Sequence, residues 1–192
     1  MTAGFSEQDM QAALTTLRNG GIILYPTDTV WGIGCDATNE NAVERIYQLK
    51  QRDDSRALII LLASERDLLQ YVASPDPAVF DFLETISKPT TIVYDSAIGL
   101  AENLIAGDGT VGIRITNDDF CKQLIKRFRK PIVSTSANIS GQPTPPDFKS
   151  IDPLIIHGVD YVVRYRQDDP SNSPPSSVIK WNKDGTQTII RL

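Results

Sequence analysis

Residues 22–52 run from an apolar segment through a polar turn into an amphipathic helix, and this order limits the folds open to the chain. The apolar run at residues 22–25 follows two glycines and stops at Pro26, which predicts a short buried strand. Asn39 is expected to cap a helix to about Leu49, because apolar residues recur there at helical spacing. A strand that leads into a helix in this way is typical of a sheet covered by helices.

The turn between that strand and helix is rich in small polar groups. Residues 27–29 (TDT) supply hydroxyls and a carboxylate, and Gly32 and Gly34 are expected to form tight turns or to let a ligand approach the backbone. The helix then delivers Lys50 and Arg52 at its carboxyl end. Hydroxyls, backbone amides and cations in one unit favour a site for a small anionic ligand.

Strand and helix signals alternate along the first two thirds of the chain. Helices are expected at residues 6–19, 64–74 and 77–86 and after Asn117, with Ser6, Ser64 and Asn117 as caps at their starts. Strands are expected at residues 57–62, 90–94, 111–116, 131–133 and 160–163. Residues 178–191 are expected to form a hairpin. No internal repeat and no dividing linker is visible, so residues 1–192 predict a single three-layer α/β (α+β) domain with a mixed sheet.

A second polar segment follows the strand expected at residues 131–133. Residues 134–141 (STSANISG) carry hydroxyl or amide side chains at most positions, and such groups need hydrogen-bond partners when buried. We expect this segment and the first turn to lie at one site.

Composition excludes several classes of protein. Of 192 residues, 41% are hydrophobic, which is enough for a substantial core, and the net charge of -5 argues against a protein that coats nucleic acid. Cys35 and Cys121 show no metal-ligand spacing and are expected to be reduced thiols. The first ten residues lack the apolar core of a signal peptide, and no run approaches a membrane span, so we expect a cytoplasmic protein without membrane contact.

Familiar catalytic motifs are missing from the sequence. The spacing Gly32-x-Gly34-x-x-Ala37 resembles a dinucleotide fingerprint, but it does not open a helix directly after its strand, and there is no Walker loop. His157 is the sole histidine and has no nucleophile at a motif spacing. Catalysis would therefore depend on positioning and charge, for which surface cations such as Lys50, Arg52, Arg56, Arg114 and Arg191 are candidates.

Five blocks in this order resemble the YrdC-like family of L-threonylcarbamoyladenylate synthases, in its short form without the extra C-terminal domain. They are residues 26–34 (PTDTVWGIG), Lys50-x-Arg52, residues 111–114 (VGIR), residues 136–141 (SANISG) and residues 176–178 (SSV). Each block alone is weak, whereas the five together are specific and span nearly the whole chain.

The resemblance implies an open, twisted sheet with a central positively charged cavity. It implies a nucleotidyltransferase that forms threonylcarbamoyl-AMP and pyrophosphate from L-threonine, bicarbonate and ATP, with Mg²⁺, for the threonylcarbamoyladenosine modification of tRNA. Downstream threonylcarbamoyl transferase proteins, and direct contact with tRNA, belong to the same expectation.

Carried over by position, the resemblance implies roles for individual residues. Threonine would contact Thr27, Thr29, Arg114, Ser134 and Ser176. The nucleotide would contact Lys50, Arg52, Arg56, Thr110, Ser136, Asn138, Thr144 and Arg191, with Lys50 and Arg52 as the catalytic cations, and no residue is assigned to a metal.

Three positions depart from the family pattern. Trp31 stands where a tyrosine is usual, Arg56 where an asparagine is usual, and Leu61 where many members have a histidine. These departures leave the exact shape of the pocket open.

Two other functions remain as alternatives. A module that binds tRNA or double-stranded RNA through the same basic cavity would bind without ATP, and its binding would weaken steeply with salt. An accessory domain that handles a carbamoyl- or acyl-phosphate would prefer another phosphate donor, which competition binding would rank.

Overall fold

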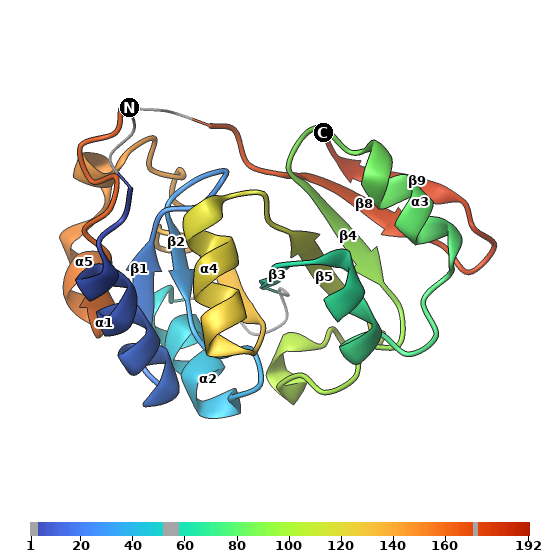
Figure 1. The fold of residues 1–192 in the computed structure, drawn as a ribbon, viewed down its shortest axis with the longest axis horizontal. Coiled ribbons are helices and arrows are strands. Elements are labelled where there is room, and N and C mark those ends of the chain that lie inside the picture. The colour runs from blue at the N-terminus through green and yellow to red at the C-terminus, as the bar shows by residue number, and fades with distance from the viewer. Residues whose placement is uncertain (1–3, 52–57, 171–172) are drawn as a thin grey trace.

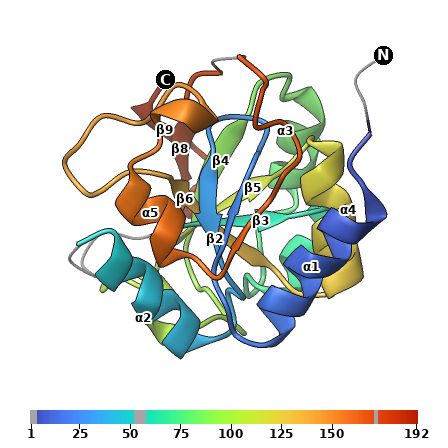
Figure 2. The ribbon, with the colours of Figure 1, turned by 90° about the vertical axis from the view of Figure 1, so that its left-hand side faces the viewer.

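Helices cover both faces of a mixed sheet in the computed structural model, which describes residues 4–51, 58–170 and 173–192 (Figures 1 and 2). Within these residues the sheet has nine strands in the order β7-β1-β2-β6-β3-β5-β4-β8-β9. The strands are β1 (Ile23–Tyr25), β2 (Gly32–Gly34), β3 (Ile59–Leu62), β4 (Thr90–Tyr94), β5 (Val111–Ile115), β6 (Ile132–Ser136), β7 (Tyr161–Val162), β8 (Ser177–Trp181) and β9 (Gln187–Arg191). The helices are α1 (Glu7–Arg18), α2 (Glu40–Leu49), α3 (Ala78–Thr85), α4 (Asp119–Phe128) and α5 (Pro153–Gly158), with 3₁₀ turns η1 (Glu65–Gln70), η2 (Glu102–Leu104) and η3 (Phe148–Ser150).

Strand directions confirm the predicted mixed sheet. Antiparallel pairs are β1–β2, β2–β6, β6–β3, β5–β4 and β8–β9. Parallel pairs are β7–β1, β3–β5 and β4–β8. The hairpin β8–β9 lies at one edge, where every residue of β9 is exposed.

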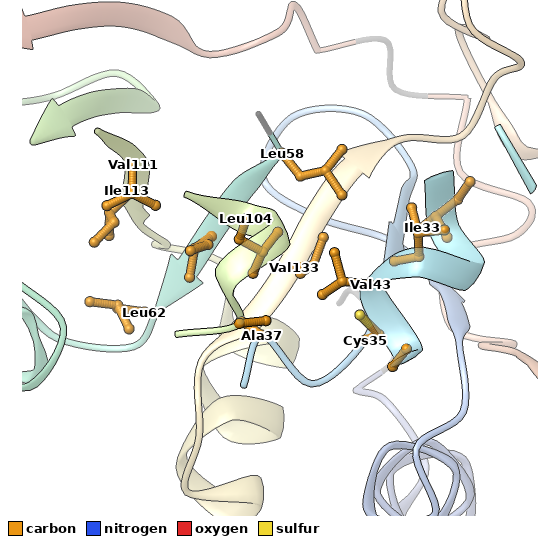
Figure 3. Close-up of a cluster of buried hydrophobic side chains, with 14 of the residues drawn as sticks. Ile33, Cys35, Ala37, Val43, Leu58, Leu62, Leu104, Val111, Ile113 and Val133 are labelled. Atoms are coloured by element: carbon orange, nitrogen blue, oxygen red, sulfur yellow. The ribbon is translucent and has the colours of Figure 1, made fainter. Parts of the chain in front are cut away.

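Two apolar cores, one on each face of the sheet, make the predicted three layers. Helices α1 and α4 lie side by side on one face, where Leu14 and Leu124 pack with Leu61 of β3 (Figure 2). Helix α2 covers the other face, where Val43 packs among side chains such as Ile33 and Val133 (Figure 3). Successive side chains of a strand point to opposite faces, so the central strands contribute apolar side chains to both cores.

Three of four predicted helix caps are confirmed, and one of them is Ser64, whose side chain accepts from the amide of Arg66 at 3.2 Å. The side chain of Ser6 accepts from the amide of Asp9 at 3.1 Å, and the side chain of Asn39 accepts from that of Ala42 at 3.1 Å. The prediction that Asn117 caps α4 is wrong, since Asp118 accepts from the amide of Cys121 at 2.8 Å. A carboxylate at a helix start gains from the helix dipole as well as from the hydrogen bond.

Gly32 and Gly34 belong to strand β2, so the prediction of a tight turn there is wrong. A β-carbon on Gly34 would lie 2.6 Å from Cε1 of Tyr25 and 2.6 Å from the carbonyl oxygen of Val133. Gly34 is therefore required by close packing inside the sheet, and not by a turn or a ligand.

Other boundaries also differ from the sequence predictions. Strand β6 continues through Ser134 and Ser136, because β2 and β3 pair with both of its edges. The helix expected at residues 64–74 is the shorter 3₁₀ turn η1, and α5 was not predicted. Within the described residues, none of the helices has the length and apolar character needed to cross a membrane.

Candidate binding site

A hollow with a volume of about 390 Å³ opens beside the central strands. Ile59 and Ser134 line it from β3 and β6, two residues along from Leu61 and Ile132, which pack under α1 and α4. Because side chains two apart share a face, the hollow lies on the α1–α4 face of the sheet. Its far wall is the edge hairpin, which contributes Val178 and Arg191.

Hydroxyl groups dominate the polar lining. The serines and threonines that line the hollow are Thr29, Thr91, Thr110, Ser134, Thr135, Ser136, Thr144 and Ser176. Among the described lining residues there is no carboxylate, and the cations are Arg114 and Arg191. Hydroxyls can donate or accept and arginine only donates, so this lining suits the oxygens of carboxylates and phosphates.

Arg114 projects from β5 and its side chain is only 3% exposed. Its Nη1 donates to Thr29 Oγ1 at 2.9 Å and lies 3.2 Å from Oδ1 of Asp28. Within the described part of the chain, its buried Nε has no hydrogen-bond partner. A buried donor without a partner is costly, and Arg114 lines the hollow, so this guanidinium is suited to an incoming anion.

The turn before β2 holds Thr29 beside that guanidinium. Thr27 Oγ1 donates to the carbonyl of Val30 at 2.7 Å and accepts from the amide of Thr29 at 3.1 Å. Thr27 is therefore buried behind the hollow and does not line it. It shapes the turn that presents Thr29.

Asp28 was not singled out by the sequence interpretation. Its carboxylate pairs with Arg114, and its Oδ2 accepts from the amide of Asn117 at 3.3 Å. Asp28 thereby ties the first polar turn to the loop after β5. The sequence TDT shows a carboxylate between two hydroxyls, but it does not show that Arg114 is the partner of that carboxylate.

The edge wall is held by contacts at Ser176. Thr91 Oγ1 and Ser176 Oγ lie 2.9 Å apart in a buried pair. Arg191 donates to the carbonyl of Ser176 from Nη2 at 2.7 Å and from Nε at 3.2 Å.

Thr110 donates from Oγ1 to Asp108 at 2.7 Å, and this hydrogen bond lowers the pKa of Asp108.

Lys50 occupies a position that the sequence interpretation did not anticipate. It does not line the hollow, and only 1% of it is exposed. Its Nζ donates to the carbonyl oxygens of Ser136 and Asn138, the latter at 2.6 Å. Asn138 also lies outside the lining, where its Nδ2 donates to the carbonyl of Gln142 at 2.8 Å.

The structure thus brings together most of the described candidates. Those that line the hollow are Thr29, Thr110, Arg114, Ser134, Ser136, Thr144, Ser176 and Arg191. Thr27, Lys50 and Asn138 lie behind it, and Arg52 and Arg56 fall outside the described residues. Thr91 and Thr135 line it without having been predicted.

Two of the departures from the family pattern lie away from the lining. The Trp31 ring packs 4.9 Å from that of Phe148, and Leu61 is fully buried in the α1–α4 core. The hollow is therefore not shaped directly by either side chain.

Neither cysteine provides a nucleophile near the hollow. Both thiols are buried, and burial raises the pKa of Cys35 and of Cys121 well above the usual value. Burial also raises the pKa of Tyr25, which donates to the carbonyl of Val133 at 3.0 Å. These groups stay protonated, and His157 lies exposed on α5 outside the lining.

The described residues do not fit a protein-held Mg²⁺ site. In this part of the chain, no three carboxylate, histidine or cysteine side chains cluster to hold a metal. A protein usually supplies Mg²⁺ with one or two carboxylates, and the described lining has none. No step is therefore assigned to a metal.

The mixed sheet and its hydroxyl-lined hollow define an α/β protein with a cavity whose lining is suited to carboxylate and phosphate groups. Residues 15–192 match a family model for Sua5, YciO and YrdC, described as "Telomere recombination". The chain therefore belongs to the Sua5/YciO/YrdC family, which confirms the resemblance found in the sequence.

Relatives agree with this assignment. A threonylcarbamoyl-AMP synthase of Pseudoalteromonas translucida is 34% identical over 177 residues, which cover 90% of this chain and 92% of the relative. One from Stenotrophomonas maltophilia is 31% identical, over 82% of this chain and 86% of the relative.

Solved structures share the fold. P. abyssi Sua5 complexed with L-threonine has a TM-score of 0.87 and 25% identity, over 98% of this chain. The match covers 55% of that Sua5 chain, so the present chain spans just over half of it. E. coli YciO has a TM-score of 0.83 and 22% identity, over 100% of this chain and 95% of the other, and supports the fold alone.

Proposed function

We propose that this chain is a threonylcarbamoyl-AMP synthase, a nucleotidyltransferase that uses L-threonine, bicarbonate and ATP. The observation that carries the proposal is the Arg114 guanidinium, which lines a hydroxyl-rich hollow and is held there by Thr29 and Asp28. The relatives of that name, similar over most of the chain, support the same reaction.

Threonine would bind at the Arg114 end of the hollow. Its carboxylate would meet the guanidinium, because two parallel N–H donors match two carboxylate oxygens. Its hydroxyl would find Thr29, Ser134 or Ser176, all within the same lining. Thr27 and Asp28 would act from behind by holding Thr29 and Arg114.

The nucleotide would occupy the rest of the hollow. Ser136, Thr144 and Thr110 offer hydroxyls, and Arg191 offers a cation from the edge strand. We further propose that Arg52 and Arg56, which follow α2 in the sequence, supply the additional charge that a triphosphate requires. Asn138 and Lys50 would support the turn beside Ser136.

The reaction needs positioning more than acid–base chemistry. The threonine amine and bicarbonate form a carbamate with loss of water, and a carbamate oxygen then attacks the α-phosphate. The bond from that phosphorus to the pyrophosphate oxygen breaks, and pyrophosphate leaves with the bonding pair. Fixed donors stabilise the charge that builds up on the phosphate oxygens.

Other parts of the proposal concern what accompanies the enzyme. Mg²⁺ would arrive with ATP as part of the substrate, since the described lining offers no carboxylate. The product would pass to threonylcarbamoyl transferase proteins that modify tRNA in the cytoplasm. The hollow does not favour direct contact with the tRNA backbone, because one of its two described cations, Arg114, is already paired with Asp28.

The decisive assay follows pyrophosphate release from purified protein. We expect release with L-threonine, bicarbonate and ATP together, and none when any one is omitted. Threonine-independent release, or no release from protein shown to be folded by circular dichroism, would contradict the proposal. Binding of RNA without ATP that weakens steeply with salt would favour the RNA-binding alternative.

A further inference from the structure

Lys50 caps the carboxyl end of helix α2 and contacts the last residue of strand β6, Ser136. Its ammonium donates to the carbonyl oxygens of Ser136 and Asn138, and 1% of the residue is exposed. Its own carbonyl oxygen accepts from the amide of Ser140 at 2.8 Å. One residue therefore holds the segment 136–140 at three points.

That segment carries the hydroxyl-rich end of the hollow. The amide of Asn138 donates to the carbonyl of Ser136 at 2.9 Å, which makes a tight turn directly after β6. Ser136 lines the hollow while its carbonyl oxygen is occupied by Lys50. The direction of the Ser136 carbonyl and the placing of its side chain are thus fixed together.

Moving the ammonium to a phosphate would undo this arrangement. The carbonyl oxygens of Ser136 and Asn138 would both lose a charged donor, and that of Ser136 would keep the amide of Asn138. Losing a charge-assisted hydrogen bond is costly. Arginine is the better ligand for a triphosphate, because its planar fork binds two oxygens, whereas a compact ammonium suits converging carbonyls.

We infer that Lys50 is a positioning residue, which acts on the nucleotide through the 136–140 turn and does not touch the triphosphate. The inference rests on the proposed function for its effect on ATP. The ordering of the 136–140 turn by the ammonium does not depend on the proposed function, because it can be measured in the protein without ligand. Ser136 is the residue through which Lys50 acts on the hollow.

The free protein provides the first test, by amide hydrogen exchange of Lys50→Met. Loss of the ammonium should speed amide exchange at Asn138 and Ser140 by about tenfold. A tenfold faster exchange corresponds to a drop in the free energy of local opening of about one typical hydrogen bond. The amide of Val133, bonded to the carbonyl of Cys35 at 2.9 Å, should keep its rate. Lys126→Met, an exposed lysine of α4, is the matched control and should change neither. Unchanged exchange at the turn in folded Lys50→Met would overturn the inference.

A double-variant cycle gives the second test. Lys50→Met should lower kcat/KM for ATP by about 100-fold, as misplacement of a binding group does. If Lys50 acts through Ser136, adding Lys50→Met to the Ser136→Ala variant should lower kcat/KM for ATP by less than about a further 3-fold. Lys50→Arg should not restore activity, although a direct phosphate contact would tolerate arginine. If the two single losses of kcat/KM multiply in the double variant, or if the Lys50→Arg variant is active, a positioning role is contradicted.

The wild-type protein decides the matter if the variants do not fold. In protein labelled with ¹⁵N-lysine, the Lys50 ammonium should give a signal that persists when a non-hydrolysable ATP analogue binds, without coupling to ³¹P. Coupling between that nitrogen and phosphorus would overturn the inference. Failure of the analogue to bind would instead refute the proposed function, while the exchange rates of the free protein would still test the ordering of the turn.

Discussion

Two arginines reach the same hollow from very different places in the sheet. Arg114 lies on β5 near the middle, has a side chain that is 3% exposed, and pairs with Asp28 and Thr29. Arg191 lies on the edge strand β9, where every residue is exposed, and its described contacts are two donations to the carbonyl of Ser176. One guanidinium is fixed by packing and charge, and the other by the hairpin backbone.

The difference teaches where this site is preorganised. A buried group that is already oriented loses little freedom when a ligand binds, whereas an exposed side chain on an edge strand loses more. The central strands should therefore set whether threonine binds, and the hairpin should tune how tightly the nucleotide is held.

The largest effect is expected at the central arginine. Arg114→Met should lower kcat/KM for threonine by about 100-fold, because it removes the buried donor and leaves Asp28 without its partner. Steady-state kinetics with threonine varied at saturating ATP would measure it. A loss below about 3-fold would place the threonine carboxylate elsewhere.

Tight packing inside the sheet at Gly34 contrasts with the open surroundings of Gly107. Gly34→Ala should lower the free energy of unfolding by about 2 kcal/mol, because the new methyl meets Tyr25 and the carbonyl of Val133 at 2.6 Å. Gly107→Ala is the matched control, since nothing lies within 4 Å of the β-carbon it would add. Urea denaturation of both variants gives the comparison, and equal stabilities would show that the centre is not tightly packed.

The acidic partner of Arg114 should have an intermediate effect. Asp28→Asn keeps the shape but removes the charge, and threonine affinity should fall by about tenfold as the guanidinium loses its orientation. Calorimetric titration should show a change for threonine and little for ATP. Equal losses for both ligands would mean that Asp28 supports the whole fold and does not position Arg114.

The smallest effect is expected at the edge. Arg191→Ala should weaken ATP binding by about 3-fold and leave threonine binding unchanged, because an exposed cation contributes little. Arg129→Ala, an exposed arginine beyond the end of α4 and outside the hollow, should change neither. An Arg191 effect as large as that of Arg114 would remove the distinction between centre and edge.

Local signals predicted local structure well. Ser6 and Asn39 cap their helices as predicted, and strand β4 has the predicted bounds, Thr90–Tyr94. The pair Asp152-Pro153 carries a start signal for α5, since the Asp152 side chain accepts from the amide of Leu154 and proline favours the first helical position.

Long-range packing could not be predicted in the same way. Gly34 is required in strand β2 because Tyr25 and the carbonyl of Val133 leave no room for a β-carbon, which no turn propensity expresses. Lys50 finds its carbonyl partners 86 and 88 positions away, so its burial depends on the assembled sheet. The resemblance predicted the candidate residues, and the fold separated those that line the hollow from those that lie behind it.

A structure of the protein with L-threonine and a non-hydrolysable ATP analogue tests the shared hollow most directly. We predict the threonine carboxylate against the guanidinium of Arg114, with the triphosphate beside Ser136 in the same cavity. Threonine bound away from Arg114, or an analogue bound outside the cavity, would contradict this account.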